Sequence, residues 1–204
     1  MTGERVEGNN GLTGRQITHW DDVRVEGVAG MHFSADGDWD SELLNAARAL
    51  CFRAFGDRFS DEDWQHSFGG GRWVLLSESE VIVHAAVVPR TIVYGDIPLA
   101  VGYVEAVAVD PDHQGQGLGR LLMREVNAWI QREYELGLLS TSRQSFYSHA
   151  GWARWQGPTF VRDLGVTRRT EDEDDGIMFL ATPRLAHVDV SQALTCEARD
   201  GDDW

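Results

Sequence analysis

A glycine-rich run between two apolar segments is the part of the sequence best suited to chemistry. It reads Gln114-Gly115-Gln116-Gly117-Leu118-Gly119. Residues 103–109 before it are mostly apolar and predict a strand, and residues 121–130 after it carry apolar side chains at helical spacing. Backbone N–H groups in such a turn, together with the helix dipole, can hold a diphosphate. Glycine permits the close approach and the positive φ that this requires.

The spacing of this turn excludes two common phosphate loops. A dinucleotide-binding turn needs G-x-G-x-x-G, but the third residue after Gly117 is Arg120. A P-loop needs a lysine, and the chain has none. The remaining pattern, Q-x-x-G-x-G after a Val-Ala-Val strand, resembles the acetyl-CoA pyrophosphate loop of the GNAT N-acetyltransferase superfamily. The plainer alternative is a glycine-rich loop that opens an ordinary helix.

Composition limits the class of protein. The 204 residues are 42% hydrophobic and 10% aromatic, which fits one domain with a full core. The net charge of −15 argues against a nucleic-acid partner and is compatible with a cationic substrate, although it can also serve solubility alone. The apolar runs are too short for a membrane span, and no leader pattern opens the chain. Cys51 and Cys196 are too few for a disulfide framework or a zinc site. We expect a cytoplasmic protein without a metal.

Residues 1–27 are polar and lack periodicity, so we expect a flexible extension before a single domain over residues 28–204. The domain is predicted to be α+β, a mixed central sheet flanked by helices. Helices are predicted over residues 41–56, 118–134 and 144–149, with a short helical turn through Trp64 and Phe68. The first of these helices has Ser41 as its cap and Gly56 as its stop. Predicted strands span residues 73–77, 81–89, 97–109, 138–140, a segment from Trp152, and residues 177–181, with antiparallel hairpins joining the first three.

A narrower resemblance extends over most of residues 31–204. It is carried by Gly102 to Glu105, Leu136 to Ser140, Tyr147 followed by Gly151-Trp152, Trp155 to Thr159, Arg169 to Gly176, Leu194 to Cys196, and the closing Arg199-Asp200-Gly201-Asp202-Asp203-Trp204. These motifs resemble the aminoglycoside 2′-N-acetyltransferases, a family within GNAT. The resemblance implies direct transfer of acetyl from acetyl-CoA to the 2′-amine of an aminoglycoside, which confers antibiotic resistance. It also implies a homodimer and no covalent acyl-enzyme.

The resemblance assigns roles to individual residues. Glu105, a carboxylate that interrupts an apolar strand, would be the general base. Tyr147 would be the general acid, and the Val107 N–H would stabilise the oxyanion. The cofactor would be held by Val107, Ala108 and Val109 at the pantetheine arm and by Gln114, Gly115, Gln116, Gly117, Leu118 and Gly119 at the pyrophosphate, with help from Arg120 and Arg124. The aminoglycoside would contact Asp57, Asp63, Glu105, Ala106, Ser140, Glu173, Asp174, Asp202 and Trp204.

Two departures from the family pattern bear on the acceptor. Arg58 stands where the family usually has an aspartate, with Asp57 one residue earlier, and the segment between Ser140 and Tyr147 is slightly short.

Two other functions stay open at this level. One is a GNAT acetyltransferase for another amine, such as a polyamine, an amino sugar, a peptide N-terminus or a cell-wall precursor. The other is a non-catalytic protein that binds acetyl-CoA or a cationic antibiotic.

Overall fold

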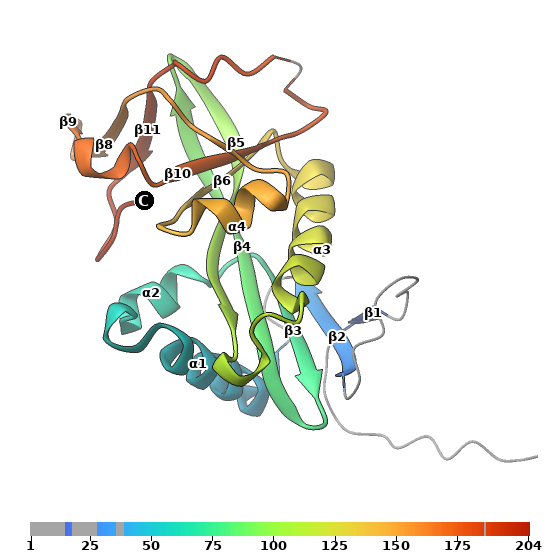
Figure 1. The fold of residues 1–204 in the computed structure, drawn as a ribbon. Helices are drawn as coiled ribbons and strands as arrows, with labels where there is room; N and C mark the ends of the chain where they lie inside the picture. The colour runs from blue at the N-terminus through green and yellow to red at the C-terminus, as the bar shows by residue number, and fades with distance from the viewer. Residues whose placement is uncertain (1–14, 18–27, 36–38, 186) are drawn as a thin grey trace, which may run out of the picture.

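The computed structural model describes residues 15–17, 28–35, 39–185 and 187–204 (Figure 1). In this part the helices are α1 (Ser41–Phe55), α2 (Asp61–His66), α3 (Leu118–Glu133) and α4 (Gln144–His149), with single 3₁₀ turns at Gly56–Arg58, Pro111–His113 and Glu171–Glu173. The strands are β1 (Arg15–Ile17), β2 (Val28–Ala35), β3 (Gly71–Ser77), β4 (Glu80–Tyr94), β5 (Ile97–Val109), β6 (Leu136–Ser140), β7 (Ala153–Arg154), β8 (Thr159–Asp163), β9 (Val166–Arg169), β10 (Ile177–Ala181) and β11 (Leu194–Glu197).

One mixed sheet joins the described strands in the order β1-β2-β3-β4-β5-β6-β10-β7. Strands β2 to β5 pair antiparallel with one another, as the sequence predicts for β3 to β5. The β5–β6 pair is parallel, and α3 forms the crossover between these two strands. The prediction of a mixed sheet flanked by helices is therefore confirmed.

The two faces of the sheet are covered by different helices. On β3, Trp73 and Leu75 pack into the core that α3 covers, whereas Val74 and Leu76 pack with α1 and α2. This alternation follows from the two-residue period of a strand. Figure 1 shows α1 and α2 on one side of β4 and α3 on the other.

Most predicted elements agree with the structure, but β2 was not predicted and β4 continues five residues beyond the predicted end at Pro89. Two further details are wrong. The residue that caps α1 is Asp40, whose carboxylate accepts from the Glu42 N–H at 2.9 Å, so Ser41 is the first helical residue. The strand expected from Trp152 is only two residues long, at Ala153–Arg154. Of the predicted extension, residues 15–17 form β1 beside β2, and the rest of residues 1–27 lies outside the described residues.

The last third of the chain adds a branch to this sheet, strands β8, β9 and β11, that the sequence did not predict. Strand β11 pairs antiparallel with the far end of β4 and parallel with β8, and β9 completes a hairpin with β8. Buried side chains of the last third, including Trp155, Leu194 and Trp204, form a core with residues 88–92 of β4, 99–103 of β5 and 136–138 of β6. The closing segment 198–204 thereby lies against β5. No helix in the described ranges is long and apolar enough to cross a membrane.

Candidate active site

The site begins where β5 and β6 separate. The two strands are paired only from Val101–Tyr103 to Leu136–Leu138. Beyond this point residues 104–109 of β5 have no partner on β6, and the Val109 oxygen accepts from Nε2 of Gln114 at 3.2 Å. An unpaired parallel edge can add an extended ligand as a further strand.

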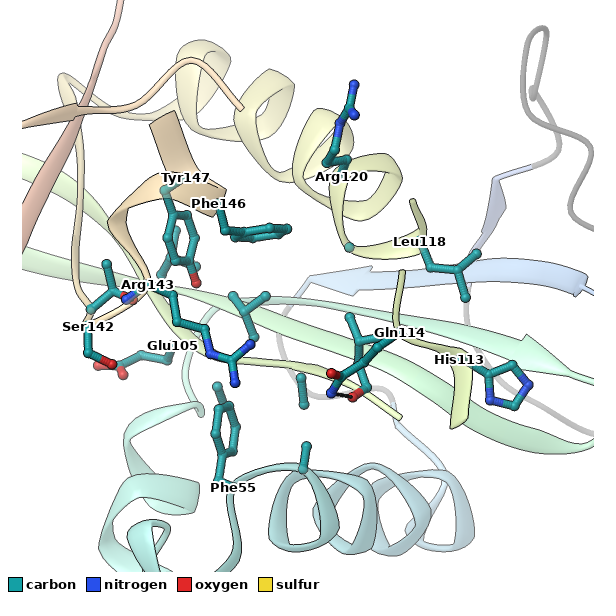
Figure 2. Close-up of a pocket in the computed structure, with 18 of the residues that line it drawn as sticks. Phe55, Glu105, His113, Gln114, Leu118, Arg120, Ser142, Arg143, Phe146 and Tyr147 are labelled. Atoms are coloured by element: carbon teal, nitrogen blue, oxygen red, sulfur yellow. Dashed lines mark hydrogen bonds between the residues drawn. The ribbon is translucent and has the colours of Figure 1, made fainter. Parts of the chain in front are cut away.

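A cavity of about 570 Å³ fills the gap between these strands. Figure 2 shows Glu105 on β5, Tyr147 and Phe146 on α4, and Arg120 on α3 arranged around it. Its lining includes most of the residues predicted for the cofactor, together with parts of α1 and α4, as follows: Ala54, Phe55, Arg58, Val104, Glu105, Ala106, Val107, Ala108, Val109, His113, Gln114, Gly115, Gly117, Leu118, Gly119, Arg120, Ser140, Thr141, Ser142, Arg143, Phe146 and Tyr147.

The glycine-rich turn has the conformation that its sequence predicts. Gly115 and Gly117 have φ of 77° and 81°, and Gly117 precedes the first residue of α3 without a side-chain cap. The first backbone N–H groups of the helix are thus free of a capping side chain and suited to an anion. A side chain at Gly119 would come within 3.1 Å of the Phe146 ring. Arg120 lines the cavity, whereas Arg124 pairs with Glu125 away from it.

Strand β5 carries a β-bulge beside this cavity. The register with β4 moves from His84 opposite Ala108 to Ala86 opposite Glu105, so two residues of β5 stand against one of β4. Ala106 has φ of 51°, a strained value for a residue with a side chain. Its carbonyl oxygen accepts a hydrogen bond from Nδ1 of His84 at 2.7 Å. The bulge lies between Glu105 and Ala108, and both Glu105 and Val107 line the cavity.

Glu105 is a carboxylate with one strong partner. Arg199 of the closing segment donates from Nη1 to its Oε1 at 2.8 Å, and both side chains are mostly buried. Burial raises the pKa of Glu105 to about 7, against the opposing effects of Arg199 and Arg90. A carboxyl with this pKa is part ionised at neutral pH and can accept a proton from an ammonium or an amine.

Tyr147 lies across the cavity from β5. Figure 2 shows its hydroxyl pointing from α4 into the cavity, on the same side as Glu105 and Arg143. Burial raises the pKa of Tyr147 above its usual value of 10. A phenol with a raised pKa keeps its proton at neutral pH, so this hydroxyl can donate a hydrogen bond into the cavity.

A second, smaller cavity of about 240 Å³ is lined by residues 168–173 and by residues 201–204 of the closing segment. Its lining is acidic and includes Glu173, Asp202 and Trp204 among the predicted substrate residues. The Ser140 hydroxyl donates a hydrogen bond to the Glu173 carboxylate. Burial, and then the charge of Asp202, raise the pKa of Glu173. Trp204 is buried and donates from Nε1 to the Thr170 hydroxyl at 3.2 Å. Four predicted residues from three separate segments are thus brought together.

Other predicted substrate residues already have partners within the protein. The Asp174 carboxylate pairs with Arg169 and accepts from the Thr159 backbone and hydroxyl. The Asp63 carboxylate closes a capping box with Ser60 at the start of α2. Asp57 is exposed, and the neighbouring Arg58 lines the larger cavity in its place. These three carboxylates, unlike Glu105, are not lining residues of either cavity.

Sequence reasoning missed several residues that the fold brings to the site. Arg199 and Arg90 both act on Glu105, and Phe55, Arg143 and Phe146 line the larger cavity. Arg199 belongs to the closing motif, so its place in that motif is a signal that could have been used. Nothing in the local pattern around Arg90 or Phe55 predicts a functional position.

Comparison with known proteins gives the family. The model of the Acetyltransferase (GNAT) domain matches residues 69–154. An aminoglycoside 2′-N-acetyltransferase from Mycolicibacterium fortuitum is 42% identical over 172 residues, which cover 82% of this chain and 88% of that protein.

Solved structures share the fold at low identity. The GNAT protein YhbS from Escherichia coli, crystallised in complex with CoA, has a TM-score of 0.60 at 18% identity and covers 87% of this chain and 93% of its own. A GCN5-related N-acetyltransferase from Kribbella flavida has a TM-score of 0.51 at 20% identity over 65% of this chain. This chain spans about a third of that protein, 34%. The chain belongs to the GNAT acetyltransferases and, within them, to the aminoglycoside 2′-N-acetyltransferase family.

Proposed function

We propose that this protein is an enzyme that transfers the acetyl group of acetyl-CoA to the 2′-amine of an aminoglycoside, and so confers resistance. The observation that carries the proposal is the position of Glu105. This buried carboxylate lines the larger cavity, and Arg199 links it to the closing segment that lines the smaller, acidic cavity. A proton acceptor between a cofactor cavity and a cation-binding cavity is what transfer to an amine requires.

Acetyl-CoA is the co-substrate of this family, and the larger cavity has the groups to hold it. The N-terminus of α3 and the turn with Gly115 and Gly117 suit the pyrophosphate. The backbone edge over residues 107–109, which is not paired with β6, suits the amide-bearing pantetheine arm. Acetyl-CoA supplies the activated acyl group, and the protein supplies orientation, proton transfer and charge stabilisation.

The residues divide the reaction between them. The neutral amine attacks the thioester carbonyl carbon, and the C–S bond breaks as the C–N bond forms. Glu105 takes the proton that the amine nitrogen loses, directly or through a water molecule. The Val107 N–H stabilises the charge on the carbonyl oxygen, and the Tyr147 hydroxyl donates a hydrogen bond to the thiolate that departs. No step needs a covalent bond to the protein.

Acidic groups would hold the polycationic acceptor. Glu173, Asp202 and the Trp204 segment line the smaller cavity, and Ser140 connects Glu173 with the larger one. We include Asp57, Asp63, Asp174 and the Ala106 backbone in this proposal because the family motif predicts them, although Asp63 and Asp174 must then serve both the fold and the ligand. We also propose a cytoplasmic homodimer, on the basis of the family resemblance, which light scattering in solution tests.

The experiment is thiol release from acetyl-CoA with two acceptors that differ at one position. Kanamycin B has an amine at position 2′, and kanamycin A has a hydroxyl there. We expect turnover with kanamycin B alone. Equal turnover of both would move the acetylated amine elsewhere, and no turnover of either would overturn the proposed acceptor. Glu105→Gln is the matched variant that tests the base.

A further inference from the structure

Three polar side chains are buried beneath the β5 bulge and take no part in the steps above. Arg72 of β3 and His84 of β4 are 3% and 0% exposed, and Cys51 of α1 is fully buried beside them. A buried arginine ordinarily has a carboxylate partner. Among the described residues no carboxylate is within ion-pair distance of Arg72. The Arg72 guanidinium instead donates hydrogen bonds to neutral groups, so its positive charge is not neutralised and polarises those groups.

The hydrogen bonds of Arg72 and His84 form a directed chain. Arg72 donates from Nη1 to Nε2 of His84 at 2.6 Å, and from Nη2 to the backbone oxygen and hydroxyl of Ser67 at 2.8 and 3.0 Å. The rings of Trp64 and Phe68 lie against its guanidinium at 4.6 and 4.7 Å. Arginine cannot accept a hydrogen bond, so Nε2 of His84 must be the acceptor. A neutral imidazole then has its proton on Nδ1.

The chain ends on the backbone of the bulge. Nδ1 of His84 is 2.7 Å from the carbonyl oxygen of Ala106, so it donates to that oxygen. Burial, and then the charge of Arg72, lower the pKa of His84 to about 3, which agrees with a neutral ring. The Cys51 thiol is 3.6 Å from Nδ1, and burial raises its pKa to about 12, so it stays protonated and adds no charge.

The same peptide group carries the Val107 N–H. The Ala106–Val107 peptide is trans, so its N–H points away from the direction of its C=O. The C=O is turned toward β4 and His84, and Val107 lines the larger cavity. A hydrogen bond donated to a peptide oxygen draws electron density from the nitrogen and makes the N–H a stronger donor. The effect is larger when a cation polarises the donor.

We propose that Arg72 and His84 are positioning residues that hold the Ala106–Val107 peptide in its strained conformation and polarise its N–H for the thioester oxygen. The proposal rests on the oxyanion role given to Val107 above. Without the His84 contact, the Ala106 oxygen keeps only the longer contact of the Cys51 thiol, at 4.0 Å, so the positive φ of Ala106 is poorly compensated and the N–H is weaker and less well directed.

Two substitutions at position 84 separate the two links of the chain. His84→Asn keeps a donor near the place of Nδ1 but cannot reach Arg72, and His84→Gln keeps an acceptor for Arg72 but loses the donor to Ala106. We expect kcat to fall about tenfold in His84→Gln, less than the loss of a whole oxyanion donor, and by a smaller factor in His84→Asn. Cys51→Ala is the control, because it leaves both links intact and removes only the weaker contact of the Cys51 thiol with the Ala106 oxygen, at 4.0 Å.

The decisive readout needs no acceptor. The infrared carbonyl band of acetyl-CoA labelled with ¹³C at the acetyl carbon should lie lower when bound to the wild type than in water. It should move back toward the free value in His84→Gln and Arg72→Met and stay unchanged in Cys51→Ala. Calorimetry should give the same Kd for CoA in all variants, because CoA lacks the thioester carbonyl of the acetyl group. A band that is equal in the wild type and in His84→Gln would overturn the proposal.

A measurement on the wild type guards against variants that do not fold. Long-range ¹H–¹⁵N NMR of the histidine rings should show His84 with a protonated Nδ1 and a bare Nε2 from pH 5 to pH 8. The opposite tautomer, or a charged ring, would overturn the chain of donors. Failure of the proposed acceptor would instead appear as a lack of aminoglycoside turnover with the carbonyl shift intact.

Discussion

Replacing Arg199 by glutamine should move the acidic limb of the pH–rate profile to higher pH. Arg199 donates to Oε1 of Glu105 at 2.8 Å, and the two side chains are 19% and 15% exposed, so solvent screens the pair weakly. Burial raises the pKa of Glu105 to about 7, and the Arg199 charge opposes this rise. Because the base works only when it is ionised, loss of the cation makes the enzyme less active on the acidic side.

The size of the change follows from the contact. An opposite charge this close lowers a carboxyl pKa by about 1–3, and Arg90 stays near Glu105, so we take about 1–2 for Arg199 alone. The ionised fraction at pH 7 then falls from about one half to between about one tenth and one hundredth. The acceptor kcat/KM should fall about five- to fiftyfold at pH 7 and recover most of this loss above about pH 9.

Thiol release measured from about pH 5.5 to pH 9.5 gives the profile, and ratios to the wild type remove the titration of the acceptor amine. Arg199→Lys keeps the cation and should keep the acidic limb near that of the wild type. Arg162→Gln makes the same change at an exposed pair with Glu197 and serves as the control. A profile for Arg199→Gln that is lower but parallel to the wild type at every pH would refute the reasoning.

Three more predictions concern single groups of the site. Glu105→Gln should lower kcat/KM by about 10²–10⁴. Because burial raises the pKa of Glu105 in the folded protein to about 7, the wild-type free energy of unfolding should also fall as the pH rises from 4.5 to about 7. Urea unfolding should show a smaller fall in the variant. Equal pH dependence in both proteins would contradict the buried state of this carboxyl. Tyr147→Phe should lower kcat about 10- to 100-fold through loss of a hydrogen bond to a charged group, with the Kd of CoA unchanged by calorimetry; a changed Kd would instead indicate a packing role. Gly117→Ala, at φ of 81°, should weaken CoA binding, whereas Gly165→Ala, at φ of 83° in the β8–β9 turn, should reduce stability alone; equal Kd values for CoA in these two variants would count against the turn as the pyrophosphate site.

The cofactor half of the site, which is the larger cavity with residues 104–120, could be predicted from the sequence because its parts are close together in the chain. A strand, a turn with Gly115 and Gly117, and an amphipathic helix follow one another, and each has a periodic or conformational signature. Strand β5 was predicted with its observed bounds for the same reason. The bulge at Ala106 has no such signature, since an alanine gives no sign of a positive φ.

The acceptor half could be predicted only in part, because its geometry depends on distant segments. The family motif pointed to Glu173, Asp202 and Trp204, which line one cavity. It could not show that the Asp174 carboxylate is taken up by Arg169, because the partner of a surface carboxylate is set by the fold of the β8–β9 hairpin. In this half strands β8, β9 and β11 were missed since they are short and carry polar residues among few apolar ones. Strand β2, outside this half, was also missed.

The two halves of the site also differ in their loop-closure entropy. The acceptor half is fastened by the Glu105–Arg199, Arg90–Asp203 and His66–Asp200 contacts, whose partners are 94, 113 and 134 residues apart. Contacts of such long range form late in folding, because the chain must be ordered before they add stability. The cofactor half can therefore assemble first, and acetyl-CoA can stabilise an intermediate in which the closing segment is still loose. On partial unfolding the order reverses, and selectivity for the acceptor is lost before the ability to bind the cofactor.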